Sequence, residues 1–308
     1  MPDLKVLKAQ RSKMSRAVED YLTACRSRGV KPSTIRDGYG FPLRNVFVPW
    51  CEEEELSSPA DLDRRTLERY AVQLREKGGR TGKPLSENTI WTYLKAVNQF
   101  LAWAAEEGEG PGAKVRLRKP PGRKIEVLER DEISALEREA SMERDRVIIR
   151  LLADAGLRPG ELISIRGCDI RRAGRGHYVV VRGKTGERMV PISPEMYRRL
   201  GNLARGEDEP VFVRLRRDQR TGEHEPLTVN GVRQMLHDLA LNTGLGKQVM
   251  PYTFRHSACR WMLLKGTPTV VVGKILGHGS ERMIAEHYAN IGDQDAHDQL
   301  MALLRAEK

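Results

Sequence analysis

Four side chains that could act together on a phosphate lie within one short stretch of the chain, residues 251 to 288. They are Arg255, His256, His278 and Tyr288. A guanidinium binds phosphate oxygens in a bidentate manner, an imidazole donates to a charged oxygen, and a phenol can attack phosphorus. Each residue alone has a plainer interpretation, because a tyrosine often packs half-buried and a histidine after a glycine can cap a turn. Only the combination indicates phosphate chemistry.

Short helices must bring these side chains to one point. The apolar residues from Trp261 to Leu264 predict a helix that ends at Gly266. The run from Val270 to Leu276 predicts a second helix, and Ser280 is a candidate N-cap for a third. Three short helices joined by turns can direct an arginine, a histidine and a phenol towards the same phosphate.

A second arginine stands directly before a proline that favours a helix start. Pro159 suits the first helical turn, so Arg158 lies where the backbone N–H groups of a helix N-terminus are exposed. Glu161 can reach back to hold the guanidinium of Arg158. The alternative is a surface ion pair, which usually contributes little to stability.

A β-hairpin with a lysine near its tip follows. The segments 177–182 and 188–192 are rich in β-branched residues and flank the sequence Gly-Lys-Thr-Gly, which predicts a hairpin that carries Lys184. This Gly-Lys-Thr is not a nucleotide-binding P-loop, because that motif needs an earlier glycine where Tyr178 stands and a following helix where a strand is predicted. Lys184 is either exposed to solvent or inserted into a DNA groove. A short strand is also predicted at 211–213, and an amphipathic helix from Thr228 to Gly244.

The composition favours a polyanionic partner. The 308 residues contain 53 Lys and Arg against 42 Asp and Glu, a formal net charge of +11. Nucleic acid is the first candidate and an anionic membrane surface the second. No apolar run is long enough to span a bilayer and the N-terminus lacks a signal-peptide core, so we expect a cytoplasmic protein at the nucleoid. The four cysteines form no C-x-x-C pair, so neither a disulfide framework nor a zinc site is indicated.

The chain divides at a basic segment that is rich in proline and glycine. Residues 1–108 have the apolar periodicity of four helices and predict a small bundle, and residues 125–308 contain the candidate chemistry. The segment 109–124 is the expected linker. It is either solvated or lies along a phosphate backbone as a cationic strap. Its basic residues are Lys114, Arg116, Arg118, Lys119, Arg123 and Lys124.

Taken in order, these motifs resemble the tyrosine recombinases of the phage integrase and Xer type along nearly the whole chain. The stretch GLRPGEL resembles the family's first arginine motif and supplies Arg158, the hairpin RGKTGERMVPI supplies the lysine, TFRHS supplies Arg255, and LGH supplies His278. Tyr288, ten residues after the LGH histidine, takes the place of the nucleophile. The resemblance implies a mainly α fold with a small β-sheet. An N-terminal helical core-binding (SAM-like) domain would precede an α+β catalytic domain with a C-terminal tail helix.

The resemblance also implies a mechanism that needs no cofactor, ATP or metal. Tyr288 would attack a DNA phosphodiester to give a 3′-phosphotyrosine and a free 5′-hydroxyl. Arg158, Arg255 and His278 would bind the non-bridging oxygens, and Lys184 would protonate the leaving oxygen. The implied partners are double-stranded DNA, a homo-tetramer on two synapsed sites and an accessory directionality factor. The apolar stripe after residue 292 either contacts a neighbouring protomer or docks on its own domain.

One position departs from the family pattern. Tyr252 stands three residues before Arg255, where the family usually has a histidine. A phenol with a pKa of about 10 can position a phosphate but is a weaker proton acceptor near neutral pH. Two alternatives therefore stay open beside an integrase. One is a catalytically silent DNA-binding protein, which this substitution favours, and the other is a type IB topoisomerase, which relaxes DNA without exchanging partners.

Overall fold

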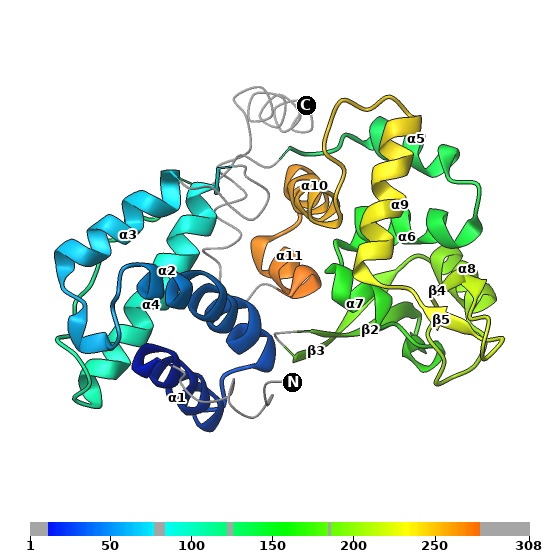
Figure 1. The fold of residues 1–308 in the computed structure, drawn as a ribbon. Coiled ribbons are helices and arrows are strands. Elements are labelled where there is room, and N and C mark those ends of the chain that lie inside the picture. Colours follow the sequence, from blue (N-terminus) through cyan, green and yellow to red (C-terminus); the bar gives the residue numbers. More distant parts are fainter. Residues whose placement is uncertain (1–11, 77–83, 122–125, 184–185, 278–308) are drawn as a thin grey trace. The chain divides into compact units, whose positions relative to one another are not determined.

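The chain folds into two compact units, which divide between Gly122 and Arg123. The computed structural model describes residues 12–76, 84–121, 126–183 and 186–277. The division lies within the basic segment 109–124. Each unit has its own hydrophobic core, and each is described by itself (Figure 1).

The first unit is helical, with the predicted helices in place. Helix α4 begins after Ser86, whose hydroxyl accepts a hydrogen bond from the amide of Thr89 at 3.2 Å. Helix α3 begins after Asp63, whose carboxylate accepts from the amide of Thr66 at 2.7 Å. The region between α1 and α2 forms two wide π-helical segments. The elements are α1 (Lys13–Ser27), π-helical Thr34–Gly40 and Leu43–Phe47, α2 (Val48–Glu53), α3 (Arg64–Glu76) and α4 (Glu87–Glu106).

Aromatic rings fill the centre of this unit. Phe47 and Phe100 are fully buried and meet edge to face with ring centroids 6.3 Å apart. Tyr70 meets Phe47 in the same manner at 5.2 Å. Tyr21 of α1 contacts Phe100 and Trp103 of α4 at 5.8 and 5.6 Å. Edge-to-face contacts of this kind add to the gain from area burial, so the aromatic cluster ties the first helix to the last.

The segment that follows α4 packs on the first unit without forming a helix or strand. Ala113, Val115 and Leu117 are half-buried against the unit's core, while the residues between them are exposed. Asn98 of α4 holds this segment through both of its side-chain groups: its Nδ2 donates to the carbonyl of Val115 at 2.9 Å, and its Oδ1 accepts from the amide of Val115 at 3.0 Å. Residues 113–117 are therefore docked rather than solvated.

The second unit combines helices with two small antiparallel sheets. One sheet has three strands in the order β1-β2-β3, and the other pairs β4 with β5. The predicted hairpin is present, with Val179 opposite Val190 and Gly183 opposite Gly186. The helices are α5 (Arg130–Glu139), α6 (Glu143–Ala155), α7 (Pro159–Ile163), α8 (Pro194–Leu203), α9 (Val229–Asn242), α10 (Pro251–Leu264) and α11 (Thr269–Leu276). The strands are β1 (Ile170–Ala173), β2 (Gly176–Gly183), β3 (Gly186–Ile192), β4 (Val213–Arg217) and β5 (His224–Pro226).

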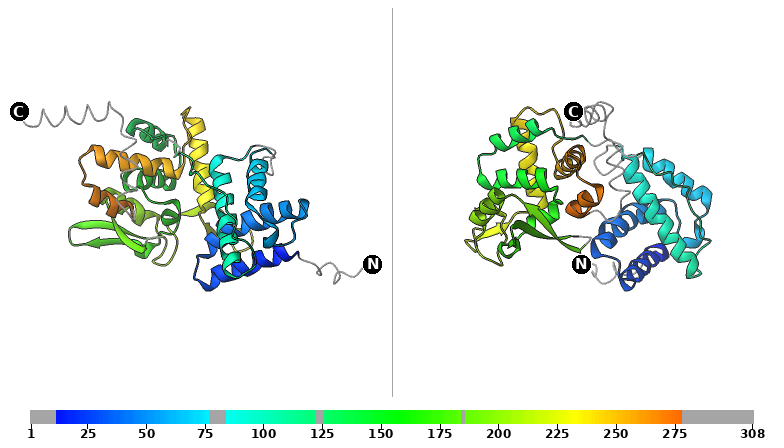
Figure 2. Two further views of the ribbon diagram at one scale, coloured as in Figure 1. Left: turned by 90° about the vertical axis from the view of Figure 1, so that its left-hand side faces the viewer. Right: turned by 180° about the vertical axis from the view of Figure 1, so that it is seen from behind.

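Helix α10 is largely buried within this unit. It packs against α6, while α11 follows beside α10 and reaches the sheet at β3 (Figures 1 and 2). Phe254 and Ala258 of α10 are fully buried, as is Leu276 at the end of α11. The two predicted helices of the candidate site are confirmed, and their packing brings the end of α11 close to the loop that follows α6.

One predicted strand was misplaced. Residues 211–213 were expected to form it, but β4 begins only at Val213 and pairs with β5. Val211 and Phe212 are buried and belong to the core instead, and the amide of Val211 bonds to the carbonyl of Ile165 at 2.9 Å. The apolar run thus fills the core just ahead of an exposed two-stranded hairpin.

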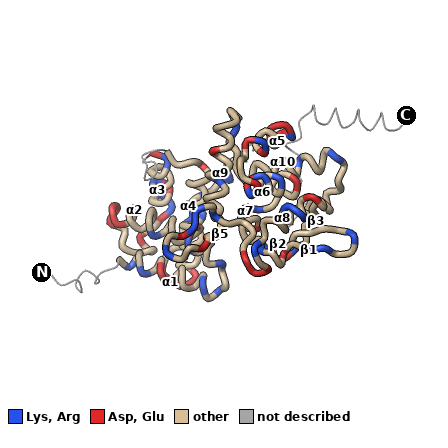
Figure 3. The backbone as a smooth tube through the Cα atoms, turned by 90° about the vertical axis from the view of Figure 1, so that its right-hand side faces the viewer, with Lys and Arg blue, Asp and Glu red and all other residues tan. Residues whose placement is uncertain are grey.

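Charge and hydropathy along the described chain show no membrane segment. None of the described helices is both long and apolar enough to cross a bilayer. Lys and Arg occur along both units and are interspersed with Asp and Glu rather than gathered on one element (Figure 3). Any basic surface is therefore limited to the residues that line an individual site.

Candidate phosphate-binding site

Arg255 is buried at the heart of the second unit. Its side chain extends from α10, the residue is 5% exposed, and its guanidinium donates to two backbone carbonyls: Nη1 to Gly156 at 2.7 Å and Nη2 to Leu276 at 2.6 Å. Burial, and then the nearby positive charge of Arg158, lower the pKa of Arg255 to about 10. The group stays charged at neutral pH, so the site holds a desolvated cation.

Arg158 approaches from the start of α7. Its own amide donates to Oε2 of Glu161 at 2.9 Å, and its Nη1 donates to Oε1 of the same carboxylate at 2.8 Å. The predicted contact with Glu161 is present. It is not a surface ion pair, because the side chain of Glu161 is only 2% exposed and that of Arg158 only 20%. A buried carboxylate of this kind must be held by several donors.

Arg188 supplies those donors, and the sequence analysis missed it. From β3, its Nη1 and Nη2 donate to Oε1 and Oε2 of Glu161 at 2.8 and 2.9 Å, a bidentate pair. Burial alone would raise the pKa of Glu161, but the hydrogen bonds from Arg188 and Arg158 outweigh it and lower the pKa to about 2. A weak sequence pattern pointed to Arg188: it alternates in β3 with Val190 and Ile192, on the side of the strand that turns inward.

The three arginines meet at the C-terminal end of α11. The Nε of Arg188 donates to the carbonyl of Ile275 at 2.8 Å, Arg255 donates to that of Leu276, and the Nη2 of Arg158 donates to that of Gly277 at 2.6 Å. The last carbonyls of a helix lack partners within the helix and carry partial negative charge. Three consecutive carbonyls here each receive a guanidinium, so residues distant in sequence are fixed around the position that precedes His278.

Two glycines make this close approach possible. Gly277 has a φ of +65°, and a Cβ atom there would lie 2.8 Å from Nη1 of Arg188. A Cβ atom on Gly183, at the end of β2, would lie 2.4 Å from Oε1 of Glu161. The hairpin and the end of α11 therefore pack directly on the buried ion cluster.

Of the remaining residues predicted for this site, two lie on α10 and the others lie outside the described residues. Tyr252 lies on α10 three residues before Arg255 and is 49% exposed, and His256 is half-buried. Lys184, His278 and Tyr288 lie outside the described residues. So do the expected N-cap Ser280, the tail after residue 292, and the basic residues Arg123 and Lys124.

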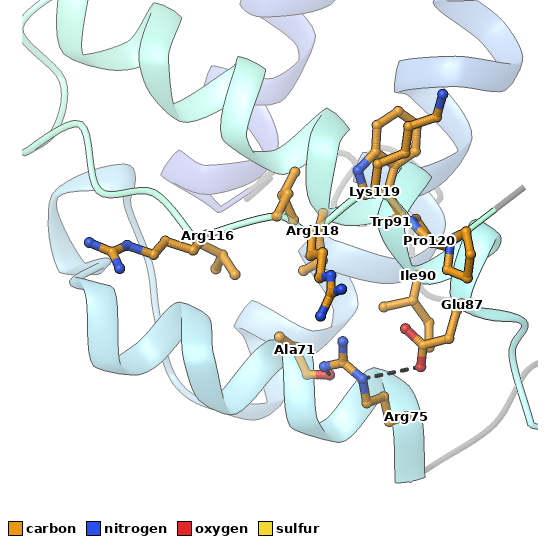
Figure 4. A pocket seen from close by; sticks show the side chains of 13 residues that line it. Ala71, Arg75, Glu87, Ile90, Trp91, Arg116, Arg118, Lys119 and Pro120 are labelled. Carbon is orange, nitrogen blue, oxygen red and sulfur yellow. Dashed lines mark hydrogen bonds and ion pairs between the residues drawn. The ribbon is translucent and has the colours of Figure 1, made fainter.

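The docked segment of the first unit forms a second, basic site. Its exposed residues are Lys114, Arg116, Arg118 and Lys119. The last three line a groove of about 520 Å³, together with side chains of α3 and α4 (Figure 4). On the wall of the groove Arg75 of α3 pairs with Glu87 of α4 at 3.3 Å, and Trp91 of α4 also lines the groove. Cations next to an aromatic ring suit a phosphate backbone.

Comparison with known proteins agrees with this geometry. The family model described as "Phage integrase family" matches residues 126–295, which include every residue of the arginine cluster. The chain belongs to the phage integrase family. Among curated relatives of this integrase family member, Tyrosine recombinase XerD of Halalkalibacterium halodurans is 28% identical over 262 residues, covering 82% of this chain and 85% of the relative. Tyrosine recombinase XerA of Pyrococcus furiosus is 29% identical over 277 residues, covering 86% of each.

Solved structures of recombinases share the fold of this phage integrase family member. A post-cleavage complex of the XerH site-specific recombinase with a palindromic difH substrate has a TM-score of 0.67 at 18% identity, covering 92% of this chain and 83% of that one. The Tn1549 transposon integrase in complex with transposon right end DNA has a TM-score of 0.65 at 19% identity, covering 94% and 99%. The predicted fold, mainly helical with small sheets and a tyrosine recombinase catalytic domain, is confirmed.

Proposed function

We propose that this protein is a site-specific DNA recombinase that cleaves and rejoins DNA through a 3′-phosphotyrosine intermediate and a Holliday junction. The observation that carries the proposal is the convergence of Arg158 and Arg255 on adjacent carbonyls at the end of α11. Two guanidinium groups fixed next to each other, one of them buried, form a preorganised binding site for a doubly charged phosphorus centre.

We assign the steps of DNA cleavage to Tyr288, Lys184 and His278. The phenol of Tyr288 loses its proton to water as its oxygen attacks the phosphorus, and the bond from phosphorus to the 5′-oxygen breaks. Lys184 gives its proton to that departing oxygen, while His278 donates a hydrogen bond to a non-bridging oxygen. The phosphotyrosine conserves the energy of the broken ester, so rejoining needs no ATP.

Tyr252 lies on α10, three residues before the buried Arg255, and is about half exposed. We assign its phenol to positioning the phosphate rather than to accepting the proton of Tyr288, because a phenol hydroxyl donates a hydrogen bond to a phosphate oxygen but is a poorer proton acceptor than an imidazole. His256 supports the site from the neighbouring position of α10.

The partner is double-stranded DNA, held in part by the basic segment of the first unit. Within the segment 114–119, the exposed basic side chains face away from the core on which the segment is docked. This orientation leaves them accessible to a DNA phosphate backbone. Exchange between two DNA sites requires four strand cleavages and each protomer supplies one nucleophile, so we propose a homo-tetramer on two synapsed sites. An accessory directionality factor and a location at the bacterial nucleoid belong to the same proposal.

A nicked suicide substrate tests this function. Duplexes are built from inverted repeats in the DNA that flanks the coding region, with a nick placed so that the cleaved end diffuses away. The wild-type protein should form a covalent adduct, and Tyr288→Phe should abolish the adduct while binding the duplex nearly as well. Binding with no adduct would indicate a silent DNA-binding protein, and relaxation of supercoiled plasmid without exchange would indicate a topoisomerase.

A further inference from the structure

We propose that Arg188 is a positioning residue of the cleavage reaction: it neutralises Glu161 and so leaves the charge of Arg158 available to the DNA phosphate. This inference rests on the proposed function and deepens it. Arg188 need not touch the DNA, because its effect passes through the carboxylate that it shares with Arg158.

The contacts show how the carboxylate is shared. Glu161 accepts two hydrogen bonds from Arg188, one to each oxygen, and one from each of the Nη1 and amide groups of Arg158. The Arg188 side chain is 12% exposed and that of Glu161 is 2% exposed, so solvent screens this pair little. Bidentate geometry assigns the carboxylate's charge chiefly to Arg188.

The charge balance of the cluster depends on this pairing. Arg158, Arg188 and Arg255 each carry one positive charge and Glu161 one negative charge, which leaves two net positive charges in the group. Attack of a phenolate on a phosphodiester gives a five-coordinate phosphorus with two negative charges, which this balance matches. Without Arg188, Glu161 would cancel one of the two remaining arginines, and the site would hold a single net positive charge.

Arg188 also forms hydrogen bonds that connect β3 to α7 and to the end of α11. It lies on β3 four residues after Lys184, and its Nε bonds to the carbonyl of Ile275, three residues ahead of His278. The absence of a Cβ at Gly277 lets the guanidinium lie against the backbone there. One side chain thus connects the hairpin, α7 and the end of α11.

The test compares single-turnover cleavage of the suicide substrate at saturating protein, where differences in binding affinity do not enter. Arg188→Gln should slow cleavage by about 10- to 100-fold, the effect of one uncompensated charge roughly 6 to 12 Å from the phosphate at an effective dielectric constant of about 20. Glu161→Gln added to Arg188→Gln removes the uncompensated carboxylate and should recover about tenfold of the lost rate. A purely structural role predicts the reverse, since the second substitution would remove further contacts.

Two further variants keep the test decisive. Arg188→Lys retains the charge with fewer donors and should cleave faster than Arg188→Gln, which also covers the case that the glutamine variant folds poorly. Arg44→Gln is the matched control, because Arg44 makes a bidentate pair with Glu19 at 2.6 Å in the first unit and makes no hydrogen bond to any residue of the cluster among those described. It should cleave at the wild-type rate. Cleavage by Arg188→Gln within about threefold of wild type, or no gain in the double variant, would overturn the proposal.

A readout independent of cleavage separates this inference from the proposed function. In protein labelled with ¹³C at the glutamate carboxyl, the Glu161 resonance should titrate at a higher pH in Arg188→Gln than in wild type. An unchanged titration would show that Arg188 does not neutralise Glu161. If wild-type protein forms no adduct on any substrate, the recombinase function fails, while the NMR titration still decides the role of Arg188.

Discussion

The ionised Glu161 should stabilise the second unit by an amount that disappears in acid. Its pKa of about 2 lies below the ordinary value of 4.5, and the difference corresponds to roughly 3 kcal/mol. Because the pKa of the folded state is lowered, this stabilisation is fully present above pH 4.5 and is lost as the pH falls towards 2. Glu161→Gln resembles the protonated carboxyl, so it should cost roughly 3 kcal/mol at pH 7 and almost nothing near pH 2.

The tryptophans allow each unit to be followed in the same sample. Trp261 is in the second unit, on α10, whereas Trp50, Trp91 and Trp103 are in the first. Urea unfolding of protein that contains 5-fluorotryptophan, followed by ¹⁹F NMR between pH 7 and pH 2, therefore yields a free energy of unfolding for each unit. Glu161→Gln should shift only the transition of Trp261.

An exposed glutamate of the same unit provides the control. The side chain of Glu195 is 68% exposed and lies 3.9 Å from Arg199, so Glu195→Gln should change the stability little at any pH. A difference between wild type and Glu161→Gln that stays constant from pH 7 to pH 2 would refute the assignment. It would mean that the carboxylate is not held by the arginines in the folded protein.

Three further predictions concern other parts of the molecule. Gly277→Ala should destabilise the second unit by more than Gly244→Ala in urea unfolding, because both glycines have positive φ but only at Gly277 would the new Cβ meet a guanidinium. Asn98→Ala should cost about 2 kcal/mol in the unfolding of the first unit through loss of its two hydrogen bonds to Val115, and no loss would show that the segment is not docked. Lys184→Ala should slow cleavage by about 10²- to 10⁴-fold, and a 5′-thio leaving group should restore most of that rate unless Lys184 is only a groove contact.

Local sequence patterns predicted the helices and the hairpin because local interactions determine them. The N-cap at Ser86 and the three- and four-residue spacing of the apolar residues of α4 act within one helix, and the hairpin depends on a glycine turn between β-branched runs. The apolar residues from Trp261 to Leu264 and the stop at Gly266 likewise predicted a helix, which the structure confirms as α10. For these elements, short stretches of sequence contain the decisive information.

Other features depended on contacts between distant segments. Val211 and Phe212 look like strand residues, but both are buried in the core, and the amide of Val211 bonds to the carbonyl of Ile165 instead of to a neighbouring strand. Arg188 appears as one of many basic residues until β3 pairs with β2 and places it beside Glu161. The basic segment is docked by Asn98, a polar residue within a mainly apolar helix. Its hydrogen-bond partner is Val115, which is 17 residues away in sequence. Such pairings are set by tertiary packing, which periodicity does not encode.

The residue that becomes joined to DNA decides whether Tyr288 is the nucleophile. The adduct trapped with the suicide substrate is digested with a protease and a nuclease, and the modified peptide is sequenced by mass spectrometry. We expect one peptide from the region 278–308, with a nucleotide 3′-phosphate on the oxygen of Tyr288. Attachment to Tyr252, or to any residue other than Tyr288, would show that Tyr288 is not the nucleophile.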